Sequence, residues 1–232
     1  MSSIPANLQA VYARITRAAG EHGRAADSVT LLAVSKTFDA ATVAACADAG
    51  QHAFGENYVQ EALDKIAALQ ALRLEWHFIG PIQSNKTRAI AEHFDWVHGI
   101  ERDKIARRLS EARPAALPPL NVCVQVNVSG EASKSGVAPG ALATLAATVA
   151  ALPRLQLRGL MTIPEPTPDS AVRRARFRLL RELKDDLIKR GHALDTLSMG
   201  MSDDLEDAIA EGATLVRVGS AIFGQRLAAQ AR

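Results

Sequence analysis

Short apolar runs alternate with longer amphipathic segments along the chain. The runs are rich in valine, isoleucine and leucine and end at glycine, asparagine or charged residues, which is typical of buried strands. Eight strands are expected, over residues 29–36, 52–57, 74–80, 96–100, 121–129, 155–163, 196–200 and 215–219. The first is apolar nearly throughout, as expected for a strand that is covered on both faces.

Helical patterns fill the segments between these runs. They cover residues 40–49, 59–69, 86–93, 102–111, 141–152, 171–190 and 203–211, and a further helix over 8–21 precedes the first strand. Strand and helix in regular alternation predict parallel strands with right-handed crossovers. Eight repeats favour a single (β/α)8 barrel of the TIM type, residues 1–232, with an extra N-terminal helix. An open doubly wound sheet is the alternative.

The helix over 171–190 combines an apolar stripe with a dense set of cations. The predicted stripe consists of Val172, Ala175, Leu179, Leu183 and Leu187. The cations are Arg173, Arg174, Arg176, Arg178 and Arg181. Spacings of three and four place the stripe on one face of the helix. The arginines are expected to form a solvated face, and a partner-binding site is the alternative.

Charge and cysteine content exclude several classes of protein. The 27 basic and 25 acidic side chains leave a formal charge of +2, so no field suited to nucleic acid is expected. No segment is apolar for the roughly 18 residues of a membrane span, and the N-terminus does not resemble a secretion signal. Cys46 and Cys123 lack metal-ligand spacing and are expected to be buried free thiols, which fits a cytoplasmic protein without a metal site.

Lys36 is the first candidate for chemistry. Reactive groups of parallel barrels collect at the carboxyl ends of the strands, and Lys36 closes the first run on the same face as Leu32 and Val34. A buried ammonium is costly, so the amine is expected either to lose its proton or to form a covalent imine. A lysine whose ammonium reaches out to water is the alternative.

The last two strands end in candidate phosphate loops. Ser198, Gly200 and Ser202 belong to the first loop, and Gly219 and Ser220 belong to the second. Glycine allows close approach of the backbone to an anion, and hydroxyl and amide groups donate to its oxygens. Ordinary strand-to-helix turns are the alternative for both loops.

The acidic residues after the first loop would repel a phosphate if their carboxylates faced it. Asp203 and Asp204 follow Ser202 directly, and Glu206 lies three residues after Asp203. This spacing resembles a capping box, which would turn the carboxylates toward the amides of their own helix.

Three further polar residues lie in or at the ends of apolar strands. Arg217 is expected to point into the barrel, where it would need a heterocyclic nitrogen as acceptor or an acidic partner in a salt bridge. The Asn57 amide could face a ligand or cap a turn. His77 is expected to be a hydrogen-bonded core histidine. Hydrolase, Walker and dinucleotide motifs are absent from the sequence.

A dense set of ordered motifs resembles the pyridoxal phosphate homeostasis protein family, which shares its barrel with the N-terminal domain of alanine racemase. The motifs are LAVSKT at 32–37, FGENY at 54–58, WHFIGPIQSNK at 76–86, VNVSGEASKSG at 126–136, GLM at 159–161, LSMGMSDD at 197–204 and VRVGSAIFG at 216–224. The resemblance covers nearly the whole chain.

The resemblance implies a fold type III barrel that binds pyridoxal 5'-phosphate (PLP) as a Schiff base on Lys36. It places Asn57 at the cofactor ring and Arg217 near the pyridine nitrogen. It implies phosphate binding by Ser198, Ser202, Gly219 and Ser220, and packing of Met161 and Met201 around the cofactor. The implied function is intracellular PLP homeostasis, as a carrier, buffer or regulator of the cofactor.

Turnover is not expected, because the related racemases use a second acid/base, a tyrosine, opposite the lysine. This chain has only Tyr12 and Tyr58, and only Tyr58 is expected near the site. A PLP-dependent amino-acid racemase remains the main alternative, and a Lys36 aldolase acting on a sugar phosphate is a second one. A largely monomeric protein that passes PLP to apo-enzymes is expected, with Lys86 or Lys134 as possible second docking points.

Overall fold

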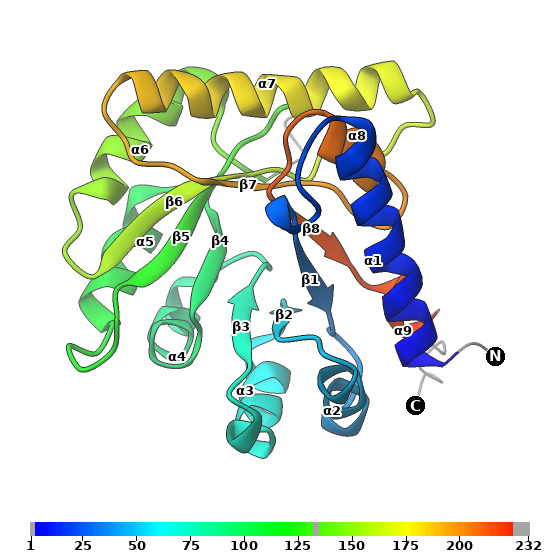
Figure 1. Ribbon diagram of the computed structural model, residues 1–232. Helices are drawn as coiled ribbons and strands as arrows, with labels where there is room; N and C mark the ends of the chain where they lie inside the picture. The colour runs from blue at the N-terminus through cyan, green and yellow to red at the C-terminus, as the bar shows by residue number, and fades with distance from the viewer. Residues whose placement is uncertain (1–2, 132–134, 225–232) are drawn as a thin grey trace.

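The computed structural model describes residues 3–131 and 135–224, and within them eight parallel strands close into a barrel (Figure 1). The strands are β1 (Thr30–Val34), β2 (Ala53–Glu56), β3 (Glu75–Phe78), β4 (Trp96–Ile100), β5 (Leu120–Gln125), β6 (Leu155–Met161), β7 (Thr196–Ser198) and β8 (Leu215–Val218). Their order around the barrel is their order in the sequence. Pairing of β1 with β8, from Thr30 beside Leu215 to Ala33 beside Val218, completes the closure. The barrel prediction is confirmed, and the open sheet is wrong.

The helices surround the barrel (Figure 1). They are α1 (Ile4–Glu21), α2 (Ala40–Asp48), α3 (Val59–Ala68), α4 (Thr87–His93), α5 (Asp103–Ala112), α6 (Leu142–Ala150), α7 (Ser170–Lys189), α8 (Leu205–Ala210) and α9 (Ser220–Phe223), with short 3₁₀ turns at Ala26–Ser28, Gln70–Leu72, Ser84–Lys86 and Pro139–Ala141. The extra N-terminal helix, α1, packs against α8 and α9. It begins at Ile4, earlier than expected, because Pro5 is well suited to a first helical turn.

Seven of the eight strands end earlier than the apolar runs predict, and only β4 ends where expected. β1 ends at Val34 and β7 at Ser198, and each is followed by a residue in the left-handed region, Thr37 (φ 71°) and Gly200 (φ 92°). β5 ends at Gln125. The residues beyond these ends become loops over the barrel mouth, which is where most of the expected site residues lie.

The barrel has two cores with different chemistry. Outward-facing side chains such as Leu31, Phe54 and Val216 pack under the helices in one large apolar cluster. The described barrel interior holds two small apolar clusters. One consists of Leu32, Ala53 and Leu215, and the other consists of Trp96, Cys123 and Met161. Seven buried polar residues also lie on the barrel strands: Glu56, His77, His98, Gln125, Thr196, Ser198 and Arg217. Barrel interiors are usually dominated by branched aliphatic residues.

The buried stripe of α7 differs from the prediction. The buried residues are Phe177, Leu180 and Leu187, whereas Val172 is 38% exposed. Leu179 and Leu183 only pack partly against the core. The helix is rotated toward its largest apolar side chain, Phe177, which a count of apolar spacings did not distinguish.

The α7 arginines form a partly exposed face and are paired with carboxylates. Arg174, Arg178 and Arg181 all donate to the carboxylate of Glu211, whose side chain is only 2% exposed. Arg173 pairs with Asp207 at 2.6 Å. The face is therefore partly solvated, as expected, and its cations pair with acidic residues of the α8 region.

The predicted capping box at α8 is also wrong. The helix begins at Leu205, and its N-cap residue, Asp204, makes no side-chain cap. The Asp204 carboxylate instead accepts a hydrogen bond from the amide of Met201 at 2.6 Å, and Glu206 pairs with Arg14 of α1 at 2.8 Å. A nearby loop amide and a long-range arginine therefore bind these two carboxylates in place of the helix amides.

The cysteine prediction is confirmed, since Cys46 and Cys123 are both free and buried. Over residues 3–131 and 135–224, none of the helices combines the length and the apolar character needed to cross a membrane.

Candidate functional site

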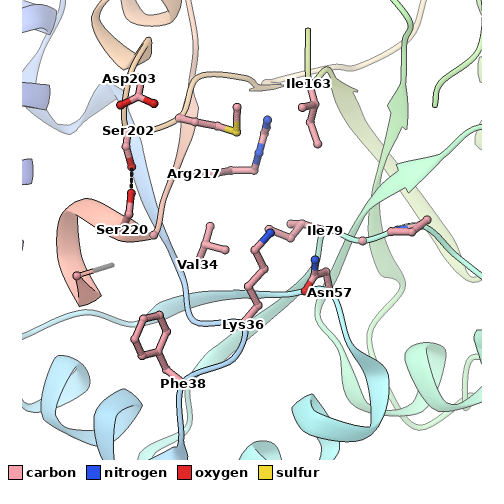
Figure 2. A pocket seen from close by; sticks show the side chains of 15 residues that line it. Val34, Lys36, Phe38, Asn57, Ile79, Ile163, Ser202, Asp203, Arg217 and Ser220 are labelled. Carbon is pink, nitrogen blue, oxygen red and sulfur yellow. Dashed lines mark hydrogen bonds between the residues drawn. The ribbon is translucent and has the colours of Figure 1, made fainter. Parts of the chain in front are cut away.

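A cavity of about 400 Å³ lies at the carboxyl ends of the strands (Figure 2). Seven of the nine residues expected at the site line it: Lys36, Asn57, Met201, Ser202, Arg217, Gly219 and Ser220. They come from the segments that follow β1, β2 and β7 and from the end of β8. Cavities of this size and place are typical of small-molecule sites in parallel barrels.

Lys36 reaches the cavity from a tight turn after β1. Figure 2 shows its side chain extending across the pocket toward Ile79 and Asn57 rather than out to bulk solvent. The turn is held by a bond from the Ser35 amide to the carbonyl of Gly55 at 3.0 Å and by one from the Thr37 amide to Glu61 at 2.6 Å. These contacts fix the backbone on both sides of the lysine.

A buried ionic cluster lies under this turn. The ammonium of Lys65 donates to the Ser35 carbonyl at 2.8 Å, to Glu56 at 2.7 Å and to Glu61 at 2.6 Å. The Ser35 hydroxyl also donates to Glu56, at 2.6 Å. Burial raises the pKa of Glu56, and the hydrogen bonds from Lys65 and Ser35 oppose that rise. Sequence reasoning missed Lys65, although Glu61 lies four residues before it on the same helix face.

Asn57 has an unused acceptor beside the cavity. Its Oδ1 is buried and accepts no hydrogen bond from the described residues. A Cβ built on Gly80 would lie 2.6 Å from the Asn57 Cβ and 2.7 Å from its carbonyl oxygen, so only glycine allows this close approach. An orphaned polar atom at a pocket wall is what a ligand-binding asparagine presents before its ligand is bound.

Arg217 projects into the barrel interior, on the side opposite Val216 and Val218, and lines the cavity. Its guanidinium donates to the Ser198 hydroxyl and to the Thr162 carbonyl, each at 2.8 Å. Burial lowers the pKa of Arg217 to about 10, so the group remains charged at neutral pH. Among the ion pairs of the described residues none involves Arg217, so the salt-bridge alternative is wrong.

Ser202, Gly219 and Ser220 form one side of the cavity. The hydroxyls of Ser202 and Ser220 lie 3.4 Å apart (dashed line in Figure 2). A Cβ on Gly219 would lie 3.2 Å from the carbonyl of Val34, so the two loops approach each other closely. Two hydroxyls at one edge suit an anionic group.

Two expected residues lie away from the cavity lining. Ser198 is fully buried, with its hydroxyl between His98 and Arg217, and Met161 packs against Trp96 and Cys123. The lining also contains residues that sequence reasoning did not select: Val34, Phe38, Ile79, Gly80, Pro81, Ile163, Asp203 and Gly224. Except for Asp203, these are apolar or glycine and carry no chemical signal in a sequence.

Two further residues considered in the sequence, His77 and Lys86, do not line the cavity. His77 is a buried, hydrogen-bonded core histidine, as predicted. Lys86 closes the 3₁₀ turn before α4 and does not line the cavity, and Lys134 lies outside the described residues. Within the described residues there is no group of three or more potential metal ligands.

The fold and the pocket together define a closed parallel β/α barrel whose ligand cavity carries a lysine and an arginine. The alanine racemase N-terminal domain family matches this chain over residues 6–227. The chain is 64% identical, over 226 residues, to the pyridoxal phosphate homeostasis protein of Pseudomonas aeruginosa, covering 97% of each chain. The chain therefore belongs to the alanine racemase N-terminal domain family and, within it, to the pyridoxal phosphate homeostasis proteins.

Solved structures agree with this assignment. The PipY protein of Synechococcus elongatus with PLP bound is 35% identical and superposes with a TM-score of 0.83, covering 96% of this chain and all of the other. Alanine racemase from Corynebacterium glutamicum is 18% identical with a TM-score of 0.72, and the match spans 63% of that enzyme. The second likeness shows the fold alone.

Proposed function

We propose that the cavity binds PLP through a covalent bond to Lys36 and that the protein serves cellular PLP homeostasis. The observation that carries the proposal is that the Lys36 amine shares one 400 Å³ cavity with the Arg217 guanidinium and the Ser202–Ser220 edge. Amine, cation and hydroxyl edge match the aldehyde, ring nitrogen and phosphate of that cofactor. The pyridoxal phosphate homeostasis protein of P. aeruginosa and the structure of PipY with PLP bound support the same ligand.

Each described group has a role in holding the cofactor. When bound, PLP would supply an aldehyde, and the Lys36 amine would be the group that holds it covalently. The Asn57 amide, with its unused acceptor, orients the ring, and Arg217 donates to the pyridine nitrogen. Because a guanidinium rarely gives up its proton, this contact keeps the nitrogen unprotonated and weakens the ring as an electron acceptor.

The anionic end of the cofactor belongs at the edge made by Ser202, Gly219 and Ser220. Ser198 has no part in this assignment, because its hydroxyl is already shared between His98 and Arg217 in the barrel interior. Met201 lines the cavity and would contact the cofactor, whereas Met161 is buried against Trp96 and Cys123 and does not line the cavity.

A carrier or buffer without turnover fits the groups at the cavity. The titratable side chains among its described lining residues are Lys36, Asp203 and Arg217, so no second acid/base of the tyrosine kind faces the lysine. Tyr12 lies on α1 and donates to Gln51, and Tyr58 is 54% exposed and outside the lining. The curated relatives are named as homeostasis proteins rather than as enzymes.

The wider assignment is a cytoplasmic, largely monomeric protein that stores PLP and passes it to apo-enzymes. This would link cofactor supply to the amino-acid and keto-acid balance of the cell. It is supported by the relatives' names and by a described lining whose titratable side chains are Lys36, Asp203 and Arg217, without a tyrosine.

Borohydride reduction of the purified, PLP-loaded protein tests the attachment. Peptide mapping should recover one pyridoxyl group on Lys36, and Lys36→Ala should remove it, while Lys104→Ala, at an exposed position, should not. A pyridoxyl group on another lysine would refute the assignment of Lys36. Incubation of the loaded protein with L-alanine should yield no D-alanine, and brisk racemisation would favour the racemase alternative instead.

A further inference from the structure

A continuous chain of hydrogen bonds crosses the barrel interior beneath the cavity. Arg217 Nη1 donates to Ser198 Oγ at 2.8 Å, and Ser198 Oγ lies 2.8 Å from His98 Nδ1. His98 Nε2 lies 2.9 Å from His77 Nδ1, and His77 Nε2 lies 2.7 Å from Glu75 Oε1. The chain joins five residues on four strands, β8, β7, β4 and β3.

The partners assign a direction to every hydrogen. A guanidinium can only donate, so Ser198 Oγ accepts from Arg217. Among the described residues the other hydrogen-bond partner of this hydroxyl is His98 Nδ1, and we assign the hydroxyl hydrogen to that bond. The hydrogen of a neutral His98 is then on Nε2 and donates to His77 Nδ1, which leaves His77 Nε2–H to donate to the Glu75 carboxylate. All four bonds point from Arg217 toward Glu75.

The charges at the two ends agree with this assignment. Burial lowers the pKa of His98 well below its ordinary value, and the neighbouring His77 and Arg217 add to that effect, so the ring is neutral. The hydrogen bond from His77 lowers the pKa of Glu75, which keeps its carboxylate charged. The chain thus runs from a fixed cation to a fixed anion.

Glu75 lies at the opposite mouth of the barrel. It begins β3 and, with His77, Trp96, Arg158 and Asp195, lines a second cavity of about 290 Å³ at the amino ends of the strands. His77 stacks on Trp96 with 5.4 Å between ring centroids, and Arg158 lies 4.9 Å from the centroid of Trp96. The Glu75 side chain is 48% exposed there.

We propose that Ser198, His98, His77 and Glu75 are positioning residues that orient and polarise Arg217 from the far end of the barrel. This inference rests on the proposed function, in which Arg217 meets the pyridine nitrogen of PLP. Ser198 and the Thr162 carbonyl fix the plane of the guanidinium, which leaves its other N–H groups for the cavity. Aligned hydrogen bonds polarise one another, so the Glu75 charge strengthens Ser198 as an acceptor.

The arrangement has a functional rather than a packing rationale. Arg217 makes no ion pair among the described residues, and Glu75 is the carboxylate to which the chain connects it. An interior of branched aliphatic residues would fill the same space without buried polar groups that require partners. A chain that is satisfied at every link is what a rigid, charged donor at the cavity floor requires.

Nitrogen-15 NMR of histidine side chains tests the chain without cofactor. In the PLP-free protein, His98 should be neutral with its hydrogen on Nε2. Ser198→Ala should shift the His98 ring signals and leave those of the exposed His93 unchanged. A His98 that carries its hydrogen on Nδ1 would overturn the proposed direction.

Two carboxylates of the second cavity provide a matched pair for the cofactor-bound protein. Glu75→Gln keeps the shape and the acceptor but removes the charge, and we expect PLP binding to weaken about threefold to tenfold with a shifted absorption maximum. Asp195→Asn removes a charge from the same cavity but lies outside the hydrogen-bond chain. It should leave the affinity for PLP within about twofold of wild type and the absorption maximum unchanged.

The two hypotheses fail in different ways. If wild-type protein binds PLP on Lys36 and Glu75→Gln matches it in affinity and spectrum, the inference is wrong and the proposed function stands. If wild type does not bind PLP, the proposed function is wrong, and the NMR measurement still decides the tautomers. If Glu75→Gln does not fold, Ser198→Ala replaces it, and an unchanged spectrum there overturns the inference equally.

Discussion

The ammonium of Lys65 lies 2.7 Å from the carboxylate of Glu56, and their side chains are only 4% and 0% exposed. This buried pair sits directly beneath the turn that carries Lys36, because the same ammonium also donates to the carbonyl of Ser35. The Oε2 atom of Glu56 has no hydrogen-bond partner among the described residues. The buried Glu56 carboxylate therefore depends on Lys65 for much of the compensation of its negative charge.

Lys65→Met should strongly destabilise the protein. The substitution leaves the Glu56 carboxylate buried, with the Ser35 hydroxyl as its remaining donor among the described residues. Breaking a buried pair typically costs about 3–5 kcal/mol. Urea unfolding followed by circular dichroism measures the change. Lys104→Met, at an exposed position of α5, should stay within about 0.5 kcal/mol of wild type.

The double substitution Lys65→Met with Glu56→Met separates charge from packing. Replacing both partners by apolar groups removes the uncompensated charge, so the double variant should regain part of the stability lost by Lys65→Met. A double variant as unstable as the sum of the two single ones would show that packing rather than charge governs this site.

Gly80→Ala should displace Asn57. The added Cβ would lie 2.6 Å from the Asn57 Cβ and 2.8 Å from its Cα, so the backbone must shift, at a cost of about 1–3 kcal/mol. PLP binding should weaken along with stability, as measured by fluorescence titration and urea unfolding. Gly140→Ala is the control, because its Cβ meets nothing within 4 Å; equal behaviour of the two variants would contradict the prediction.

Glu211 should stabilise the protein in a pH-dependent manner. Burial alone would raise the pKa of Glu211, but hydrogen bonds from Arg178 and Arg174 outweigh it and lower the pKa below the ordinary value of 4.5. The stabilisation is thus fully present above pH 4.5 and is lost as the pH falls through the pKa of the folded state. Glu211→Gln should cost about 1–2 kcal/mol at pH 7, since solvent screens the half-exposed arginines.

The difference in unfolding free energy between wild type and Glu211→Gln should shrink steadily below pH 4.5. Urea unfolding at a series of pH values measures it. Glu182→Gln, on an exposed position of the same helix α7, should show almost no difference at any pH. A pH-independent gap for Glu211→Gln would mean that shape, not charge, explains its effect.

Both thiols should be inert in the folded protein. Burial raises the pKa of Cys46 to about 11 and that of Cys123 to about 12, so very little thiolate exists at pH 8. An aromatic disulfide reagent should therefore react only slowly with native protein and with two thiols per chain after unfolding in urea. Rapid reaction of one thiol per chain with the reagent in the folded protein would contradict this expectation.

Much of the architecture follows from local patterns. The eight apolar runs predict the eight strands, and alternation along the first run places Lys36 on the same side as Val34, which also lines the cavity. The same alternation places Arg217 opposite Val216 and Val218. These predictions succeed because the direction of a strand side chain depends on its position in the strand and on little else.

Partners across the barrel were beyond such patterns. Ser198 precedes a loop whose composition suits phosphate binding, yet its hydroxyl is hydrogen-bonded to His98, a residue 100 positions away. Lys65 was overlooked because a lysine on an amphipathic helix normally faces water, and Glu206 bonds Arg14 of α1 instead of its own helix.

The chain by itself thus determined the barrel, the strand faces and the cluster of polar residues at one mouth, because hydrophobic periodicity and strand alternation act over a few neighbouring residues. The tertiary structure alone decided which of those polar groups reach the cavity and which bond beneath it. Closing eight strands brings distant side chains within hydrogen-bond distance, and the register between strands, which no local pattern specifies, selects the pairs that meet.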